Sequence, residues 1–292
     1  MTPARSAVSV RGLRKTYGSF EALRGVDFDI EEGETFALLG PNGAGKSTTI
    51  EILEGYRDRS GGTAEVLGVD PQRGGTAWKA RLGIVLQSGI EAADVTVREQ
   101  LVHFSRFYPK RRDVDELIAA VGLTDKAKTR IRNLSGGQRR RLDVALGVVG
   151  RPELLFLDEP TTGFDPEARH QFWDLIRDLK REGTTILLTT HYLDEAAQLS
   201  DRVAVIARGT LIDLGAVDAI GGADARIPIV RWRDAAGAPQ QERTDRPGAV
   251  VARLTAQLGG EPRDLEVIRP SLEDIYLELV RETGAPAEEA TA

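Results

Sequence analysis

Short continuous runs of apolar residues, separated by segments with helical spacing, define the class of fold of this chain. Runs without alternating polar residues are typical of strands that are buried on both faces of a parallel sheet. We predict such strands at 35–40, 81–87, 154–160, 184–191 and 202–209. Helical patterns are found at about 97–108, 113–121, 136–149 and 167–182. This alternation predicts an α/β fold with a mixed, mainly parallel sheet.

Two regions of the chain differ from this alternation. Residues 8–30 have the pattern of strands with one exposed face, because Asp27 and Asp29 alternate with apolar neighbours. The block at about 95–150 is mostly helical, so we expect it to form a helical subdomain with its own lobe.

The composition changes after about residue 215, where glycine, alanine, proline and charged residues become frequent. Residues 226–232 and 264–270 resemble strands, and 246–260 and 271–284 resemble helices. The last helix would place Leu272, Ile275, Tyr276 and Leu279 on one face. We therefore predict a first domain over 1–215, a small α+β accessory domain over 216–284 and a disordered tail over 285–292.

The overall composition excludes some classes of protein. The 292 residues include no cysteine, so neither disulfides nor cysteine-ligated metal sites can form. A net charge of −6 argues against a dedicated nucleic-acid binder. No apolar stretch reaches the length of a membrane span, and the N-terminus has no signal-peptide pattern. We expect a cytoplasmic protein that depends on another chain for any membrane contact.

The sequence GPNGAGKST at 40–48 fits the pattern of a phosphate-binding loop between a strand and a helix. Its backbone N–H groups and the following helix N-terminus would bind phosphate oxygens. Lys46 would neutralise the β- and γ-phosphates, and Ser47 would ligate Mg²⁺. The alternative is a glycine-rich turn that binds nothing. The predicted contact residues are Gly40, Pro41, Asn42, Gly43, Ala44, Gly45, Lys46, Ser47 and Thr48.

An acidic pair, Asp158 and Glu159, ends the predicted strand at 154–160. Carboxylates at the carboxyl end of a parallel strand lie beside the ligand crevice. We predict that Asp158 holds Mg²⁺, directly or through water, and that Glu159 polarises the attacking water. The alternative is a pair of exposed acids in the turn before Pro160.

A second glycine motif, LSGGQ at 134–138, stands at the start of a predicted helix. Ser135 and Gln138 have the spacing of a capping box. The box does not explain Gly136 and Gly137, which leave the helix N-terminus bare enough for an anion to approach its N–H groups.

With these motifs in this order, the sequence resembles the ATP-binding cassette (ABC) family over nearly all of 8–215. LSGGQ is the signature motif of that family. The resemblance implies a head-to-tail dimer in which each Mg-ATP lies between one chain's phosphate loop and the other chain's signature helix. It therefore places Ser135, Gly136, Gly137 and Gln138 on a nucleotide that the partner copy holds.

The resemblance also assigns roles to single residues outside these motifs. Tyr17 matches the aromatic residue that stacks on adenine, and Gln87 matches the glutamine that reaches Mg²⁺ and the attacking water. His191 matches the switch histidine at the γ-phosphate. The alternatives are an ordinary strand aromatic for Tyr17 and a polar strand end for Gln87. We expect His103 and His170 to lie on the surface.

The loop TTGFDP at 161–166 stands where the family usually has a sequence like Ser-Gly-Leu-Asp-Pro. Asp165 matches the aspartate of that loop and is expected near the nucleotide, although Asp165 and Pro166 also suit a plain helix start. Thr162 and Phe164 depart from the commonest pattern. We expect Phe164 to alter the dimer contact without abolishing hydrolysis.

The segment PSLEDIYLELV at 270–280 resembles the C-terminal segment of daunorubicin/doxorubicin-resistance-type ATP-binding subunits. Those subunits pair with a separate multi-span permease of the ABC-2 type. The resemblance implies the ATPase subunit of an exporter, peripheral on the cytoplasmic face of the cell membrane. The alternative for this segment is a helix that docks on its own chain or on a twin copy.

Two other functional classes compete with this interpretation. A soluble ABC-type ATPase acting on DNA or ribosomes would usually carry a long coiled coil or a second cassette, and the chain has neither. A regulator that binds ATP without hydrolysing it is disfavoured by the presence of Glu159 and His191. The transported substrate stays open among drugs, lipids, polysaccharides and ions.

Overall fold

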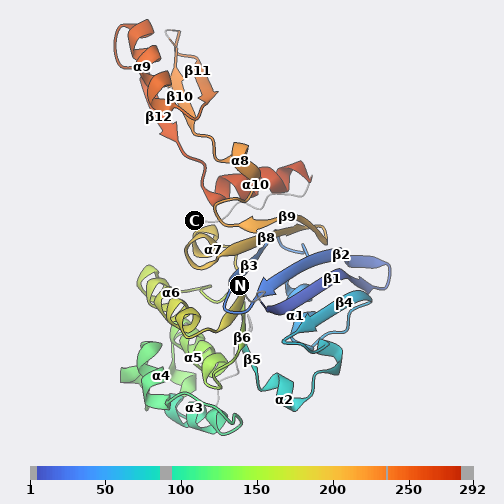
Figure 1. Cartoon of the computed structure of the whole chain (residues 1–292). Coiled ribbons are helices and arrows are strands. Elements are labelled where there is room, and N and C mark those ends of the chain that lie inside the picture. Colours follow the sequence, from blue (N-terminus) through green and yellow to red (C-terminus); the bar gives the residue numbers. More distant parts are fainter. Residues whose placement is uncertain (1–4, 86–93, 235, 284–292) are drawn as a thin grey trace.

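The computed structural model describes residues 5–85, 94–234 and 236–283 (Figure 1). Its centre is a six-stranded sheet in the order β5-β6-β7-β3-β8-β9, parallel except for β9. The strands are β3 (Thr35–Leu39), β5 (Leu82–Val85), β6 (Leu154–Asp158), β7 (Thr185–Thr189), β8 (Arg202–Ala207) and β9 (Thr210–Ala216). The interior residues of β3, β6 and β7 are buried on both faces, as their continuous apolar sequences predict.

A second, antiparallel sheet packs on the first through an apolar core. It contains β1 (Ser6–Tyr17), β2 (Phe20–Glu31) and β4 (Gly61–Val66). Phe28 of this sheet stacks on Phe36 of β3, with ring centroids 5.4 Å apart. Asp27 and Asp29 lie on the more exposed face of β2, which agrees with the predicted alternation.

Helices cover the central sheet and form a separate lobe at the bottom of Figure 1. The lobe contains α3 (Val97–Ser105), α4 (Val114–Ala120) and the start of α5 (Gly136–Val148). The remaining helices of this part are α1 (Lys46–Leu53), α2 (Thr76–Lys79), α6 (Pro166–Arg181) and α7 (Leu193–Leu199). Among the described helices, none combines the length and apolarity that crossing a bilayer requires.

The predicted α/β class with a mainly parallel sheet and a helical lobe is confirmed. Some element ends differ from the predicted ones. The helix expected over 97–108 ends at Ser105, and Pro109 disfavours helical geometry at Tyr108. Strand β4 was not predicted, since Gly61 and Gly62 at its start weaken the strand pattern.

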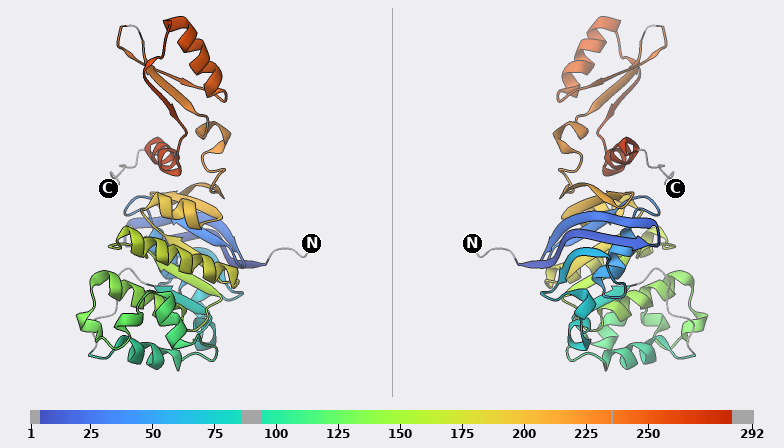
Figure 2. Two further views of the ribbon diagram at one scale, coloured as in Figure 1. Left: turned by 90° about the vertical axis from the view of Figure 1, so that its left-hand side faces the viewer. Right: turned by 90° about the vertical axis from the view of Figure 1, so that its right-hand side faces the viewer.

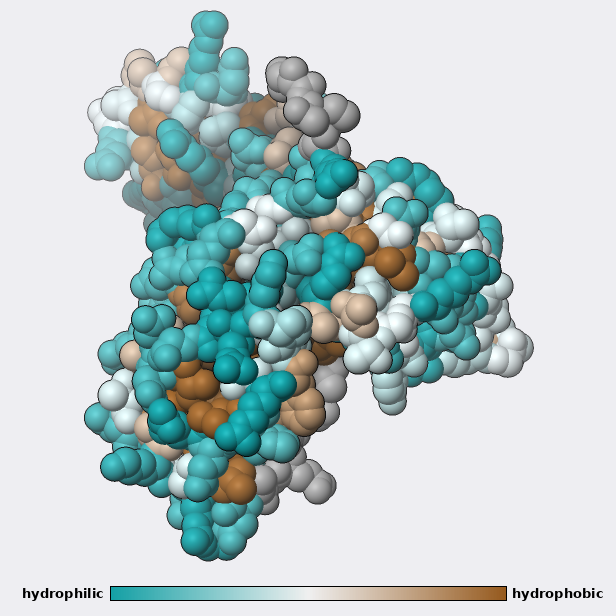
Figure 3. Space-filling view, turned by 60° about the horizontal axis from the view of Figure 1, so that its bottom comes forward, coloured by the Kyte–Doolittle hydropathy of each residue, from teal (hydrophilic) through white to brown (hydrophobic). Residues whose placement is uncertain are grey.

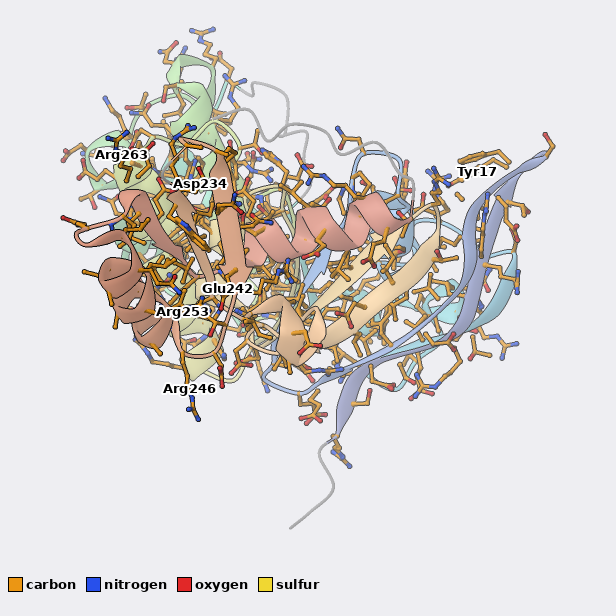
Figure 4. The ribbon with its side chains drawn as sticks, turned by 90° about the horizontal axis from the view of Figure 1, so that it is seen from above. Tyr17, Asp234, Glu242, Arg246, Arg253 and Arg263 are labelled. Carbon is orange, nitrogen blue, oxygen red and sulfur yellow. The ribbon has the colours of Figure 1, made fainter. Side chains whose placement is uncertain are left out.

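A small appendage, residues 229–268, stands apart from the rest at the top of Figures 1 and 2. Strands β10 (Ile229–Arg233), β11 (Pro239–Arg243) and β12 (Arg263–Ile268) form an antiparallel sheet, and α9 (Pro247–Leu258) covers one face. The core of the appendage is small and centres on Val230, Val250 and Leu254. Arg253 of α9 pairs with Glu242 of β11 at its surface (Figure 4).

The last helix, α10 (Leu272–Glu282), leaves the appendage and packs against α7 (Figure 2). The short α8 (Gly222–Ala225) lies beside it (Figure 1). Leu272 and Ile275 belong to the large apolar cluster that also contains Ala196 and Leu199 of α7. In the structure this helix therefore docks on its own chain. The domain boundary at 215/216 stays a prediction.

We expect Ile275→Ala to lower the free energy of unfolding by about 2–4 kcal/mol, because it opens a cavity under α10. Ile275 is only 1% exposed. The measurement is denaturant unfolding followed by far-UV circular dichroism. Leu258→Ala on α9 is the control, since Leu258 is 41% exposed and should change stability by less than about 0.5 kcal/mol. Equal losses for both variants would contradict the docking of α10.

Candidate active site

Close packing under the loop at 40–45 requires glycine at positions 40 and 45. A Cβ on Gly40 would lie 2.2 Å from the carbonyl oxygen of Ile206. Gly45 has φ +108°, and a Cβ there would lie 2.6 Å from Leu23 Cδ2. The loop can therefore take only glycine at these positions, and it leads directly into α1.

Lys46 is the charged residue of this loop, and it is only 7% exposed. Its Nζ donates to the carbonyl oxygens of Gly40 (2.6 Å) and Pro41 (3.1 Å). The ammonium thus lies inside the curve of the loop, where an anion would meet it. The other predicted contacts divide by exposure: Ala44 is buried, Pro41, Gly45 and Thr48 are partly exposed, and Asn42, Gly43 and Ser47 are exposed.

The acidic pair is held by the neighbouring strand β7. Asp158 faces Thr189 in the parallel ladder, and the Thr189 hydroxyl donates to Asp158 Oδ1 at 2.5 Å. The backbone N–H of Glu159 donates to the Thr189 carbonyl oxygen at 3.1 Å. Since β7 lies between β3 and β6, the phosphate loop, the acidic pair and the residues after β7 share one edge of the sheet.

Glu159 and His191 come together at this edge. The distance between Glu159 Oε2 and His191 Nδ1 is 3.6 Å, and the glutamate side chain is 16% exposed against 48% for the histidine. Glu159 has φ +47°, in the left-handed region that is costly for a residue with a Cβ. Strained backbone of this kind is frequent at functional sites.

Arg140 of α5 supports the backbone of the acidic pair, and we did not predict this role from the sequence. The arginine is 8% exposed, and its Nε donates to the Pro160 carbonyl oxygen at 3.0 Å. One terminal nitrogen donates to the carbonyl oxygens of Asp158 (2.7 Å) and Glu159 (3.1 Å). Burial lowers the pKa of Arg140, although nearby carboxylates oppose the shift.

A spacing signal in the sequence could have revealed Arg140. Along α5 it precedes the buried residues Val144 and Val148 by four and eight positions, so all three lie on one helix face. A charged residue at an apolar position of a helix usually has a buried partner.

The predicted capping box at the start of α5 is present. The N–H of Gln138 donates to Ser135 Oγ at 3.2 Å, and the N–H of Ser135 donates to Gln138 Oε1 at 3.1 Å. Neither Gly136 nor Gly137 has a positive φ. A Cβ on Gly136 would meet no described atom within 4 Å, and one on Gly137 would meet only the Gly163 carbonyl oxygen, at 4.0 Å. Packing among the described residues therefore does not require glycine at either position.

Comparison with known proteins identifies the family. The ABC transporter family model matches residues 23–162. The daunorubicin resistance ATP-binding protein DrrA3 of Streptomyces coeruleorubidus is 36% identical over 94% of this chain and 96% of that protein. The chain belongs to the ABC transporter family. A Nod factor export ATP-binding protein I of Paraburkholderia xenovorans is 39% identical to this ABC ATPase over 77% of this chain and 76% of that protein.

Solved structures agree on the fold of the ABC ATPase. The ATP-binding subunit of an ABC transporter has a TM-score of 0.71 at 22% identity, over 94% of this chain and 99% of that chain. A dimeric ATP-binding cassette in a post-hydrolysis state, bound to ADP and Pi, has a TM-score of 0.65 at 22% identity over 72% and 98%.

The remaining family positions are placed as follows. Tyr17 ends β1 at the side of the ABC ATPase away from the appendage (Figure 4), and the cationic groups of Lys15 and Arg57 lie 5.1 and 5.2 Å from its ring centroid. Asp165 accepts from the N–H of Ala168 as the N-cap of α6. Gln87 lies outside the described residues. The nucleotide roles of all three stay predictions.

Phe164 is buried within its own chain. Its side chain is 7% exposed and packs edge-on against Phe172 of α6, with ring centroids 6.0 Å apart. The aromatic ring therefore contributes to the core of its own chain, and the expected effect of Phe164 on the dimer contact stays a prediction. His103 and His170 are exposed, as predicted.

The residues present suit Mg-ATP. The hydroxyl of Ser47 and the carboxylate of Asp158 are oxygen donors of the type that Mg²⁺ prefers. The glycine cradle and Lys46 suit the phosphates. Among the described residues, no cluster of three or more acidic, histidine or cysteine side chains forms a metal cage.

The ionisation of Glu54, at the end of α1, makes the free energy of unfolding depend on pH. It is 6% exposed, and its pKa is raised to about 8 by burial first and then by the charges of Asp158 and Glu51. A carboxyl whose pKa is higher in the folded state stabilises the fold below pH 4.5, and this contribution is lost as the pH rises through 8.

We expect Glu54→Gln to remove the part of the fall in unfolding free energy at high pH that is due to Glu54. Without nucleotide or Mg²⁺, the free energy of unfolding of the parent should fall by about 2–4 kcal/mol more than that of the variant between pH 5 and pH 9. Denaturant titrations at several pH values measure the difference. Glu65→Gln on the exposed side of β4 is the control and should follow the parent. Parallel pH profiles for Glu54→Gln and the parent would contradict the assignment.

Proposed function

We propose that this ABC ATPase is the ATP-hydrolysing subunit of an exporter and works as a head-to-tail dimer with a separate membrane permease. The two relatives named above are called a daunorubicin resistance protein and a Nod factor export protein. Both names concern resistance or export, and the first relative matches nearly the whole chain. We propose that the exported molecule is a drug, a lipid or a polysaccharide, and the name of the first relative supports a drug.

The proposal of a dimer rests on the N-terminus of α5, which begins with two glycines and therefore has no side chains there. Gly136 and Gly137 cost about 1 kcal/mol each relative to alanine inside a helix, and no close contact among the described residues requires them. An exposed helix N-terminus without side chains suits an anion that approaches from outside the chain. In a head-to-tail dimer that anion is the γ-phosphate of the ATP that the partner copy holds.

Hydrolysis depends on positioning and charge stabilisation. Lys46 and the loop N–H groups neutralise the phosphates. Ser47, Gln87 and Asp158 would hold Mg²⁺, which would neutralise charge on the phosphate oxygens when it is bound. Glu159 orients or deprotonates the attacking water, and His191 holds the γ-phosphate. Closure of the dimer excludes water, and release of phosphate reopens it.

The permease would be a multi-span chain of the ABC-2 type, and the protein would then lie on the cytoplasmic face of the membrane. The helical lobe offers apolar surface to such a partner (Figure 3). Phe107, directly after α3, is 66% exposed and contacts His103 and Phe104 edge-on.

Glu159→Gln should retain ATP binding and lower kcat at least about 100-fold, because general-base catalysis is lost. With Mg-ATP the variant should elute as a dimer in size-exclusion chromatography. The matched control is Lys46→Ala, which should bind ATP weakly and stay monomeric. Hydrolysis by Glu159→Gln at the parent rate would exclude Glu159 as the base, and unchanged ATP affinity in Lys46→Ala would exclude the role of Lys46.

The partner can be identified with the same variant. Tagged Glu159→Gln, incubated with Mg-ATP and detergent-solubilised native membranes, should recover a multi-span protein that lacks its own cassette. Mass spectrometry identifies the recovered chain, and Lys46→Ala serves as the control without ATP-dependent closure. Recovery of ribosomal or DNA-bound proteins from the soluble fraction alone would favour the alternative of a soluble ABC-type ATPase.

A further inference from the structure

A buried carboxyl lies behind the active site and has no role in the mechanism above. Glu195 of α7 is 0% exposed, and Trp173 Nε1 of α6 donates to its Oε1 at 3.2 Å. Burial raises the pKa of Glu195, and the hydroxyls of Thr190 and Thr161, with Trp173, lower it again. A buried carboxyl normally needs partners on both oxygens.

The two threonines belong to the loops that carry nucleotide-facing residues. Thr190 directly precedes His191, and its Oγ1 accepts from the N–H of Tyr192 at 2.9 Å. Thr161 is 1% exposed and opens the loop that ends at Asp165. Glu195 thus lies where the histidine loop and the loop at 161–165 meet.

Around Glu195, one hydrogen-bond donor and one acceptor lack partners among the described residues. Among the described residues, Glu195 Oε2 and Thr161 Oγ1 are both buried and have no partner with hydrogen-bond geometry. A buried polar group without a partner destabilises a fold. These two atoms are therefore candidates for a functional role. The hydroxyl of Thr161 affects the same carboxyl whose second oxygen is unsatisfied.

We propose that Glu195 is a positioning residue that aligns the His191 loop with the loop at 161–165, through a Thr161 Oγ1–Glu195 Oε2 hydrogen bond that forms as the ATP-bound site reaches the transition state of hydrolysis. This inference rests on the proposed function and deepens it. A bond that forms only at that point stabilises the transition state more than bound ATP, so it raises kcat without tightening ATP binding.

Two substitutions at Thr161 separate this role from packing. Thr161→Val keeps the shape and removes the hydroxyl, whereas Thr161→Ser keeps the hydroxyl and removes a methyl group. We expect Thr161→Val to lower kcat about tenfold with KM within about twofold, and to raise the unfolding temperature, because it removes an unsatisfied polar atom. Thr161→Ser should retain the parent kcat.

Glu195→Gln completes the test. Its amide oxygen can still accept from Trp173, but the second acceptor is lost, so kcat should fall to a similar extent. The double variant Glu195→Gln/Thr161→Val should fall no further than either single variant, because both remove one bond. Asp194→Asn, the exposed carboxylate next to Glu195, is the control and should keep the parent kcat.

The measurements are steady-state ATPase kinetics, binding of a fluorescent ATP analogue and thermal unfolding. A Thr161→Val variant with the parent kcat, a loss in Thr161→Ser but not in Thr161→Val, or additive losses in the double variant would each overturn the inference. If Glu195→Gln does not fold, the two Thr161 variants decide. A parent protein without ATPase activity would instead contradict the proposed function.

Discussion

The active site depends on one guanidinium. Arg140 donates to the carbonyl oxygens of three successive residues, 158–160. Those residues include Glu159, whose left-handed backbone costs about 1–2 kcal/mol. Hydrogen bonds to a charged donor contribute about 1.5–3 kcal/mol each, enough to hold the strained turn. The same helix begins at Gly136 and Gly137, so α5 joins the proposed anion site to the acidic loop.

The parallel ladder places this loop next to the rest of the site. Pairing of Asp158 with Thr189 aligns the ends of β6 and β7, and β3 adds the phosphate loop on the other side of β7. The register of three buried strands therefore determines which side chains meet. Apolar burial supplies most of the stability of such a sheet, and the polar groups at its edge are arranged for binding.

Much of the fold was predictable because its strands are buried on both faces and its loops carry strong motifs. The apolar sequence before Gly40 and before Asp158 locates two strands without ambiguity. Arg140 was missed because its neighbours Arg139 and Arg141 make the segment look exposed, and only the helix rotation selects the middle residue. Glu195 was missed because it is covered by Trp173 of α6, which comes from a distant part of the sequence.

The appendage is connected to the main part of the chain at both of its ends. The chain leaves the main sheet after β9, forms residues 229–268 and returns as α10 to cover α7. The appendage is therefore an insertion that is anchored at both ends. An insertion has less freedom to reorient than a tail on a single linker. A truncation after residue 215 would remove α10 as well, and would uncover Ala196 and Leu199 on the helix that follows His191. Any change in such a truncated protein would therefore combine the loss of α10 from α7 with the loss of the appendage.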